Sequence, residues 1–292
     1  MASGTTARRF TRDAGSAGED VARQAEAAGE DVARSRQLEW LARAGLVARG
    51  VVYVLIGFLA IKVSLGTGGE TTDQQGALKT IASGTFGTVL LVLVAIGLFG
   101  YALWRLVRAG IGHGPETGDD ELKDRISGVV SGIAYGALGV TAVKILIGAS
   151  SSSSSSKTEK ATGGVLDWPA GRYLVIAAGL VVIGVAVDQA LKGIKRKFLE
   201  DSKTEQMSPA VDQVFTAAGV VGYVARAVVF ALIGWFVVKA AIDYDPDKAV
   251  GLDQALSKLA NSTFGPVVLG IVAAGLIAFG CYSILDARYR RV

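Results

Sequence analysis

Six long apolar segments, separated by polar stretches, dominate the chain from residue 44 onward. Two of them are uncharged, with 25 residues between Lys79 and Arg105 and 27 between Lys258 and Asp286. The other four run over approximately residues 44–63, 126–147, 171–190 and 214–241. A helix needs roughly 20 apolar residues to cross the hydrocarbon core of a bilayer. The pattern therefore predicts an all-α integral membrane protein with six transmembrane helices.

The distribution of basic residues predicts how these helices are oriented. Six spans place both termini on one side of the membrane, and if that side is cytoplasmic, 21 of the 30 lysines and arginines lie inside. Cytoplasmic connections normally carry the excess of Lys and Arg. We therefore expect a multi-pass protein of the plasma membrane with both termini in the cytoplasm. The outer connections are then residues 64–84, 148–168 and 243–262.

A two-helix unit recurs three times. Arg49–Lys62 aligns without gaps with Arg226–Lys239, and Ser131–Lys144 fits the same frame. In the second helices, Ala-Ala-Gly-Leu occurs at residues 177–180 and again at 273–276, and Ala95 begins the related Ala-Ile-Gly-Leu. Recurrence at this scale indicates a repeat architecture.

Repeats of two spans keep the same orientation, so their symmetry axis would lie along the membrane normal. The simplest closed arrangement is a pseudo-threefold six-helix bundle with one hairpin in each third, and a linear row of hairpins is the alternative. The repeats occupy residues 40–110, 124–198 and 212–292 and follow a polar cytoplasmic arm, residues 1–38. This arm is either disordered or a weakly amphipathic helix. Ser150–Ser156, seven serines in a row, predicts a flexible polar linker without chemistry.

The repeat resembles that of a bacterial membrane-protein family known only as a domain of unknown function, with three tandem two-helix units. The resemblance covers about residues 40–292 and is clearest in Trp40–Gly50, Gly251–Leu256 and Ala287–Val292. The middle repeat departs from it, because Ser131 replaces the arginine and the serine run replaces the Gly-Leu-Asp segment. The resemblance implies the six-pass topology and implies no reaction.

Charges inside two of the spans are the most informative feature. Arg49 and Lys62, like Arg226 and Lys239, lie 13 residues apart, which is about 20 Å along a helix against a hydrocarbon core of roughly 30 Å. One interpretation is that both side chains snorkel toward their own membrane surfaces. The other uses helical phase, because Arg49 lies on a stripe of residues at i, i+4 spacing that ends at Gly57. On that interpretation the arginines face the bundle and the lysines face outward.

A buried guanidinium needs a carboxylate or several carbonyl groups as partners. Asp188 and Asp286 lie at about the depth of the two arginines. We therefore expect Asp188 or Asp286 to pair with Arg49 or Arg226, and the simplest role of such a pair is to lock the helices together.

Two further sets of residues recur in the repeats. The first set consists of lysines near the outer ends of the first helices: Lys62, Lys144 and Lys239. They would form a ring that holds anionic lipid headgroups or attracts anions to a pore. Alternatively, they are simple interfacial anchors. Glycines within the helices permit close helix contact: Gly57, Gly139 and Gly234 in the first helices, and Gly97, Gly179 and Gly275 in the second.

Other chemistry is weakly represented. The acidic stretch 243–247 is similar to the start of a calcium-binding loop, but Lys248 stands where that loop requires glycine, so a solvated acidic turn is expected. His113 has no neighbouring nucleophile or carboxylate set, and Cys281 reads as a small apolar residue within a helix. We expect no metal, no cofactor and no enzymatic activity.

Two hypotheses on function remain. The first is a non-enzymatic membrane scaffold or interaction protein that contacts the lipid bilayer, anionic headgroups and an unidentified membrane-protein partner. The alternative is a transporter or channel for small solutes or ions along the axis between the repeats. Nucleic-acid binding is not expected despite the pI of about 9.1, because the basic residues lie mainly at the ends of apolar segments.

Overall fold

The computed structural model describes residues 36–111, 121–149 and 152–290. Within these ranges six helices are long and apolar enough to cross a membrane: α2 (Arg36–Ser64), α4 (Gly87–Ile111), α5 (Glu121–Leu146), α7 (Gly171–Ile194), α8 (Pro209–Asp243) and α10 (Gly265–Tyr289). The predicted all-α fold with six helices of membrane-spanning length and composition is confirmed. Almost all of the arm expected at residues 1–38 lies outside the described residues.

Each repeat inserts a short helix between its two long ones: α3 (Gln74–Ala82), α6 (Ser154–Leu166) and α9 (Leu252–Ala260). The prediction of a flexible serine linker is therefore wrong for its described part, because Ser153 caps α6 by accepting a hydrogen bond from the Ser156 amide. Short 3₁₀ turns complete the fold: η1 (Lys197–Leu199), η2 (Thr204–Gln206) and η3 (Pro246–Lys248).

The two uncharged segments are not single helices. In the first, α3 ends at Ala82 and α4 begins at Gly87; in the second, α9 ends at Ala260 and α10 begins at Gly265. A Cβ at Gly87 would lie 2.1 Å from the Ala82 carbonyl oxygen, and a Cβ at Gly265 would lie 1.9 Å from that of Ala260. Glycine thus permits the tight turn from each short helix into the long helix that follows.

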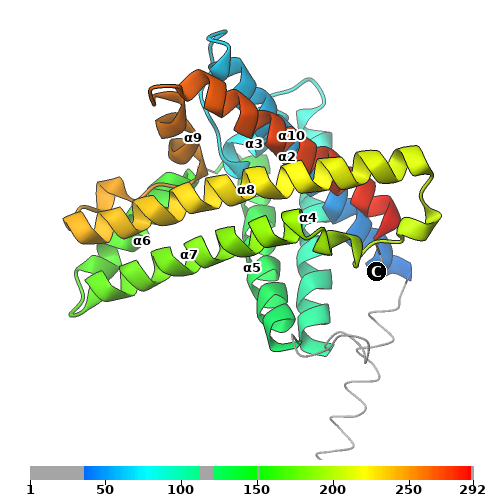
Figure 1. Ribbon diagram of the computed structural model, residues 1–292, viewed down its shortest axis with the longest axis horizontal. Coiled ribbons are helices and arrows are strands. Elements are labelled where there is room, and N and C mark those ends of the chain that lie inside the picture. The colour runs from blue at the N-terminus through cyan, green and yellow to red at the C-terminus, as the bar shows by residue number, and fades with distance from the viewer. Residues whose placement is uncertain (1–35, 112–120, 150–151, 291–292) are drawn as a thin grey trace, which may run out of the picture.

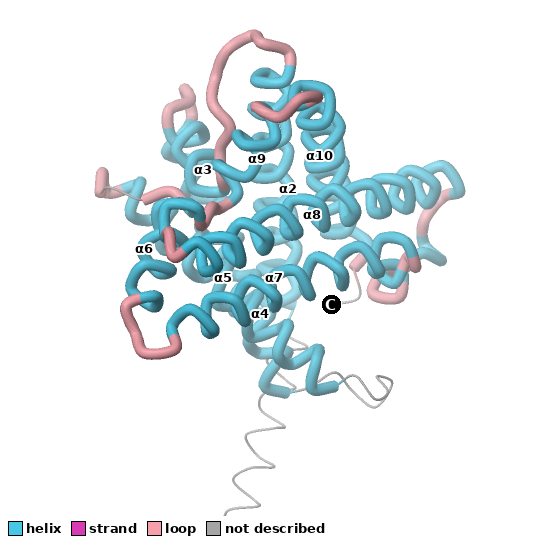
Figure 2. Tube along the Cα trace, turned by 60° about the vertical axis from the view of Figure 1, so that its left-hand side comes forward, coloured by secondary structure: helices cyan, strands magenta, loops and turns pink. Residues whose placement is uncertain are grey.

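The second helix of each repeat packs against the first helix of the next repeat. α4 lies beside α5, α7 beside α8, and α10 beside α2 (Figures 1 and 2). These three interfaces follow one another in cyclic order. Within a repeat, α2 packs on α4 and α8 on α10, but the described parts of α5 and α7 share no comparable interface. One hairpin per third therefore describes the first and third repeats, while the middle repeat is open.

Large apolar side chains fill the contacts between the first and third repeats. Ile56, Leu98, Leu269, Leu276 and Phe279 are at most 1% exposed. They come from α2, α4 and α10, so the core lies where these helices meet.

The six glycines singled out in the sequence lie at close contacts. A Cβ at Gly57 would lie 2.7 Å from the carbonyl oxygen of Ala273 on α10, and a Cβ at Gly234 would lie 2.9 Å from that of Gly179 on α7. A Cβ at Gly97 would approach α2, a Cβ at Gly139 would approach the ring of Phe99, and a Cβ at Gly275 would approach α8. A larger residue at these positions would force the helices apart.

Helix α7 provides a matched test of this packing. A Cβ at Gly179 would lie 2.6 Å from Val238 Cγ2, whereas nothing lies within 4 Å of a Cβ at Gly184. We expect Gly179→Leu to lower the stability of the detergent-solubilised protein by about 1–3 kcal/mol through overpacking, and Gly184→Leu to leave it unchanged. Thermal unfolding of both variants measures this, and equal effects would contradict the packing.

Candidate functional site

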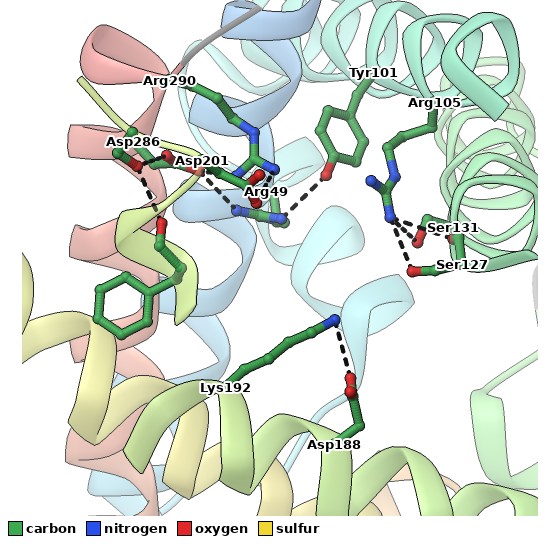
Figure 3. Close-up of polar contacts among 12 residues, drawn as sticks. Arg49, Tyr101, Arg105, Ser127, Ser131, Asp188, Lys192, Asp201, Asp286 and Arg290 are labelled. Carbon is green, nitrogen blue, oxygen red and sulfur yellow. Dashed lines mark hydrogen bonds and ion pairs between the residues drawn. The ribbon is translucent and has the colours of Figure 1, made fainter. Parts of the chain in front are cut away.

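Arg49 is at the centre of a polar network inside the membrane-spanning part of the protein (Figure 3). Its side chain is buried, Nε donates to Ser283 Oγ at 3.1 Å, and Nη1 donates to the Tyr101 hydroxyl at 3.3 Å. Its Nη2 lies 3.8 Å from Asp286 Oδ2. Arg49 thus joins α2 to both α4 and α10.

Asp286 is fully buried and extends the network toward the connection between α7 and α8. Its Oδ1 accepts a hydrogen bond from Ser202 Oγ at 3.2 Å, and its Oδ2 accepts one from Arg290 Nη1 at 2.9 Å. Arg290 also donates through Nη2 to Asp201 Oδ2 at 3.0 Å. Two arginines are therefore balanced by two carboxylates, and this charge-paired network fixes the end of α10 against the 201–202 segment.

Arg226 has a different environment, made of aromatic rings. Its guanidinium carbon lies 4.4 Å from the ring centroid of Phe279 and 5.4 Å from those of Tyr53 and Phe230. The guanidinium carbon of Arg49 lies 5.2 Å from the Phe279 centroid as well. Such contacts stabilise a desolvated guanidinium by about 2 kcal/mol. In the described part of the chain Arg226 has no carboxylate at ion-pair distance, and its Nε is buried without a hydrogen-bond partner.

Arg105 belongs to the same polar region, and no pattern in the sequence singles it out. Its Nη2 donates to Ser131 Oγ at 3.0 Å and to the hydroxyl and carbonyl oxygens of Ser127, both at 3.3 Å. Ser131 occupies the position that is arginine in the first and third repeats. The middle repeat therefore receives its guanidinium from α4, on the opposite side of the interface.

The other carboxylate considered in the sequence has a different partner. Asp188 pairs with Lys192 of its own helix at 3.0 Å, so of the alternative pairings expected from the sequence the structure forms Arg49–Asp286 and not one with Asp188. Both side chains of this pair are about one-third exposed, and Figure 3 shows them directed from α7 toward the region of Arg49 and Arg105.

A second polar cluster joins the three short helices. Asp73 caps α3 through the Gly76 amide at 2.8 Å and also accepts a hydrogen bond from the Ser154 amide. Asp253 Oδ1 on α9 accepts hydrogen bonds from the hydroxyls of Ser154 and Ser155. The serine run thus supplies structural contacts to both neighbouring repeats, and it holds together the connections between the two long helices of each repeat.

The remaining candidates lie near the C-terminal ends of the first helices of the repeats. Lys144 and Lys239 are exposed and Lys62 is half-buried. In the acidic turn, Lys248 Nζ lies 2.9 Å from Asp243 and 3.3 Å from Asp245. The hydrogen bond to Asp243 raises the pKa of Lys248, so this lysine stays charged and takes the place that a cation would need.

Comparison with known proteins identifies the repeat. A family described as Domain of Unknown Function (DUF1206) matches the chain three times, at residues 44–112, 126–196 and 221–290. The chain belongs to this DUF1206 family. The expected family with three tandem repeats is confirmed.

A relative of this DUF1206 protein is "Uncharacterized protein YxxB" of Bacillus subtilis (strain 168). The two are 33% identical over 253 residues, which cover 86% of this chain and 90% of the relative. No solved structure matches the chain. The matched region thus covers most of both proteins.

The buried network predicts unequal roles for the two carboxylates of this DUF1206 protein. Asp286→Asn keeps the shape of the side chain but leaves Arg49 without its carboxylate, so we expect a loss of about 3–5 kcal/mol. Asp188→Asn disrupts a partly exposed pair within one helix and should cost less than about 1 kcal/mol. Unfolding in detergent measures both variants, and an Asp286→Asn protein as stable as the wild type would refute the structural role of the network.

Proposed function

We propose that this DUF1206 protein is a non-enzymatic scaffold of the plasma membrane that holds a transmembrane helix of another protein against its middle repeat. The observation that supports this proposal is that the six long helices are buried to unequal extents. The most apolar windows of α5 and α7 are only 22% and 17% buried, against 56%, 50% and 50% for α2, α4 and α10. The middle repeat therefore leaves two spanning helices available for a partner.

The packing of the other repeats favours a rigid scaffold over a transporter. Apolar side chains fill the contact between α2, α4 and α10, and the network around Asp286 joins α10 to α2 and to the segment between α7 and α8. A transporter has to rearrange its repeats around a central site, and a charge-paired core opposes such a movement.

The uncovered face of α7 has the properties of a helix-packing surface. Ala177, Val181 and Gly184 are exposed and follow one another at i, i+4, i+7 spacing, and Asp188 continues the stripe. Small residues permit close approach of a second helix, and polar residues in a bilayer favour a protein partner over lipid tails. The expected partner is therefore an apolar helix that has small residues along the contact and a hydrogen-bonding group opposite the Asp188–Lys192 pair.

The proposed orientation places this ion pair near the cytoplasmic surface. The excess of basic residues on the side of both termini supports it. The exposed lysines Lys144 and Lys239 then lie at the outer surface, where they would contact anionic headgroups.

Photo-crosslinking in intact membranes tests the scaffold. A photoreactive residue at Val181 should yield a discrete adduct with another membrane protein, and Gly184→Leu should abolish it because the added side chain blocks close approach. Ile271, which is 67% exposed on α10, is the matched control position and should yield none. Lipid adducts alone at both positions, or an adduct at Val181 that survives Gly184→Leu, would overturn the proposal.

A further inference from the structure

Three guanidiniums lie near the contacts between repeats. Arg49 lies at the α10–α2 interface, Arg105 lies at α4–α5, and Arg226 of α8 lies beside Phe279 of α10 and Tyr53 of α2. Their positions correspond, because Arg49, Ser131 and Arg226 each precede a packing glycine by eight residues: Gly57, Gly139 and Gly234. The three guanidiniums are therefore equivalent features of the repeat, although the middle one comes from the other helix.

The partners of these arginines follow the same spacing. Ser283, which accepts from Arg49, lies ten residues after Ala273, whose carbonyl oxygen faces Gly57. Gln189 lies ten residues after Gly179, whose carbonyl oxygen faces Gly234. Gln189 thus occupies the position on α7 that corresponds to that of Ser283 on α10. Both Gln189 Oε1 and Arg226 Nε are nevertheless buried without a hydrogen-bond partner.

Arg49 and Arg226 converge on one aromatic region. Their guanidinium carbons lie 5.2 and 4.4 Å from the centroid of the same ring, Phe279. Tyr135 of α5 lies beside Tyr101, the hydrogen-bond partner of Arg49, with ring centroids 4.7 Å apart. Helices from all three repeats therefore meet around these two cations.

The charges in this region do not balance. Arg49 and Arg290 are matched by Asp286 and Asp201. Arg226 has aromatic neighbours only, and Arg105 has hydroxyl and carbonyl acceptors only, as far as the described residues show. Arg49 Nη2 also has no hydrogen-bond partner. Arg105 and Arg226 are half-buried, and an uncompensated guanidinium within a bilayer is costly, so an anion placed beside them would be stabilised.

We propose that an anion of the phosphate type binds between Arg49 and Arg226, with the Tyr135 hydroxyl as an additional donor. A guanidinium offers two parallel N–H donors that match the oxygens of such an anion. The phosphate group belongs either to a free inorganic anion or to a lipid headgroup drawn in through the open middle repeat. The binding residues are the same in both cases.

Thermal unfolding of the purified full-length protein in detergent provides the test. At constant ionic strength, inorganic phosphate should raise the unfolding temperature in a saturable way, because a ligand that binds only the folded state stabilises it. Arg226→Gln should weaken the apparent phosphate affinity at least tenfold. Lys239→Gln, which removes an exposed charge from the same helix, should leave the affinity unchanged.

Two further measurements keep the proposal testable. If Arg226→Gln does not fold, Tyr135→Phe replaces it, because this variant keeps the ring and loses only the hydroxyl, and it should weaken phosphate binding several-fold. Mass spectrometry of the intact protein distinguishes the sources. A phospholipid retained by the wild type and lost by the variant identifies a headgroup, whereas saturable binding of phosphate by lipid-free protein identifies a free anion. Absence of both, or equal binding by wild type and variant, would overturn the proposal.

Discussion

A guanidinium inside a bilayer must find its hydrogen-bond acceptors and its counter-charge within the protein, and this constraint organises the interior of the DUF1206 fold. Arg49 meets it with Ser283, Tyr101 and Asp286. Each partner belongs to a helix other than α2, so satisfying one side chain fixes three helices relative to one another. Because water cannot replace these contacts in the hydrocarbon core, the helices cannot separate without leaving a buried charge unpaired.

The same requirement explains the cyclic arrangement of the repeats. The second helix of one repeat meets the first helix of the next, and a guanidinium–serine contact lies at two of the three interfaces. At α4–α5 the arginine and the serine have exchanged helices relative to α10–α2. The contact is thus kept although the residue at the aligned position is different. Where α7 meets α8, Gln189 and Arg226 leave buried polar atoms unpaired, and this third interface adjoins the open middle repeat.

The sequence was sufficient for the large features and insufficient for the pairings. Segment length gave six helices, and self-similarity gave the three repeats. The starts of α4 and α10 at Gly87 and Gly265 agree with the expected connections 64–84 and 243–262, but the short helices α3 and α9 within these connections were not expected. Helix α6 was missed, because the serines of its first turn find their acceptor on Asp253 of another repeat. Arg105 was not selected, because its partner Ser131 lies across an interface that hydropathy does not specify. The Ala-Ala-Gly-Leu alignment was also displaced, since Gly179 packs as Ala273 does and not as Gly275 does.

The central claim is that an arginine–serine contact joins consecutive repeats whichever helix supplies the arginine. A double-mutant cycle of Arg105→Ser and Ser131→Arg, followed by unfolding in detergent, tests it most directly. Each single variant should be destabilised, since one loses the guanidinium and the other places two like charges together. The double variant carries its arginine on the first helix and its serine on the second, as at α10–α2. It should recover most of the lost stability through a coupling energy of about 1–3 kcal/mol. A double variant whose loss equals the sum of the two single losses would contradict the account.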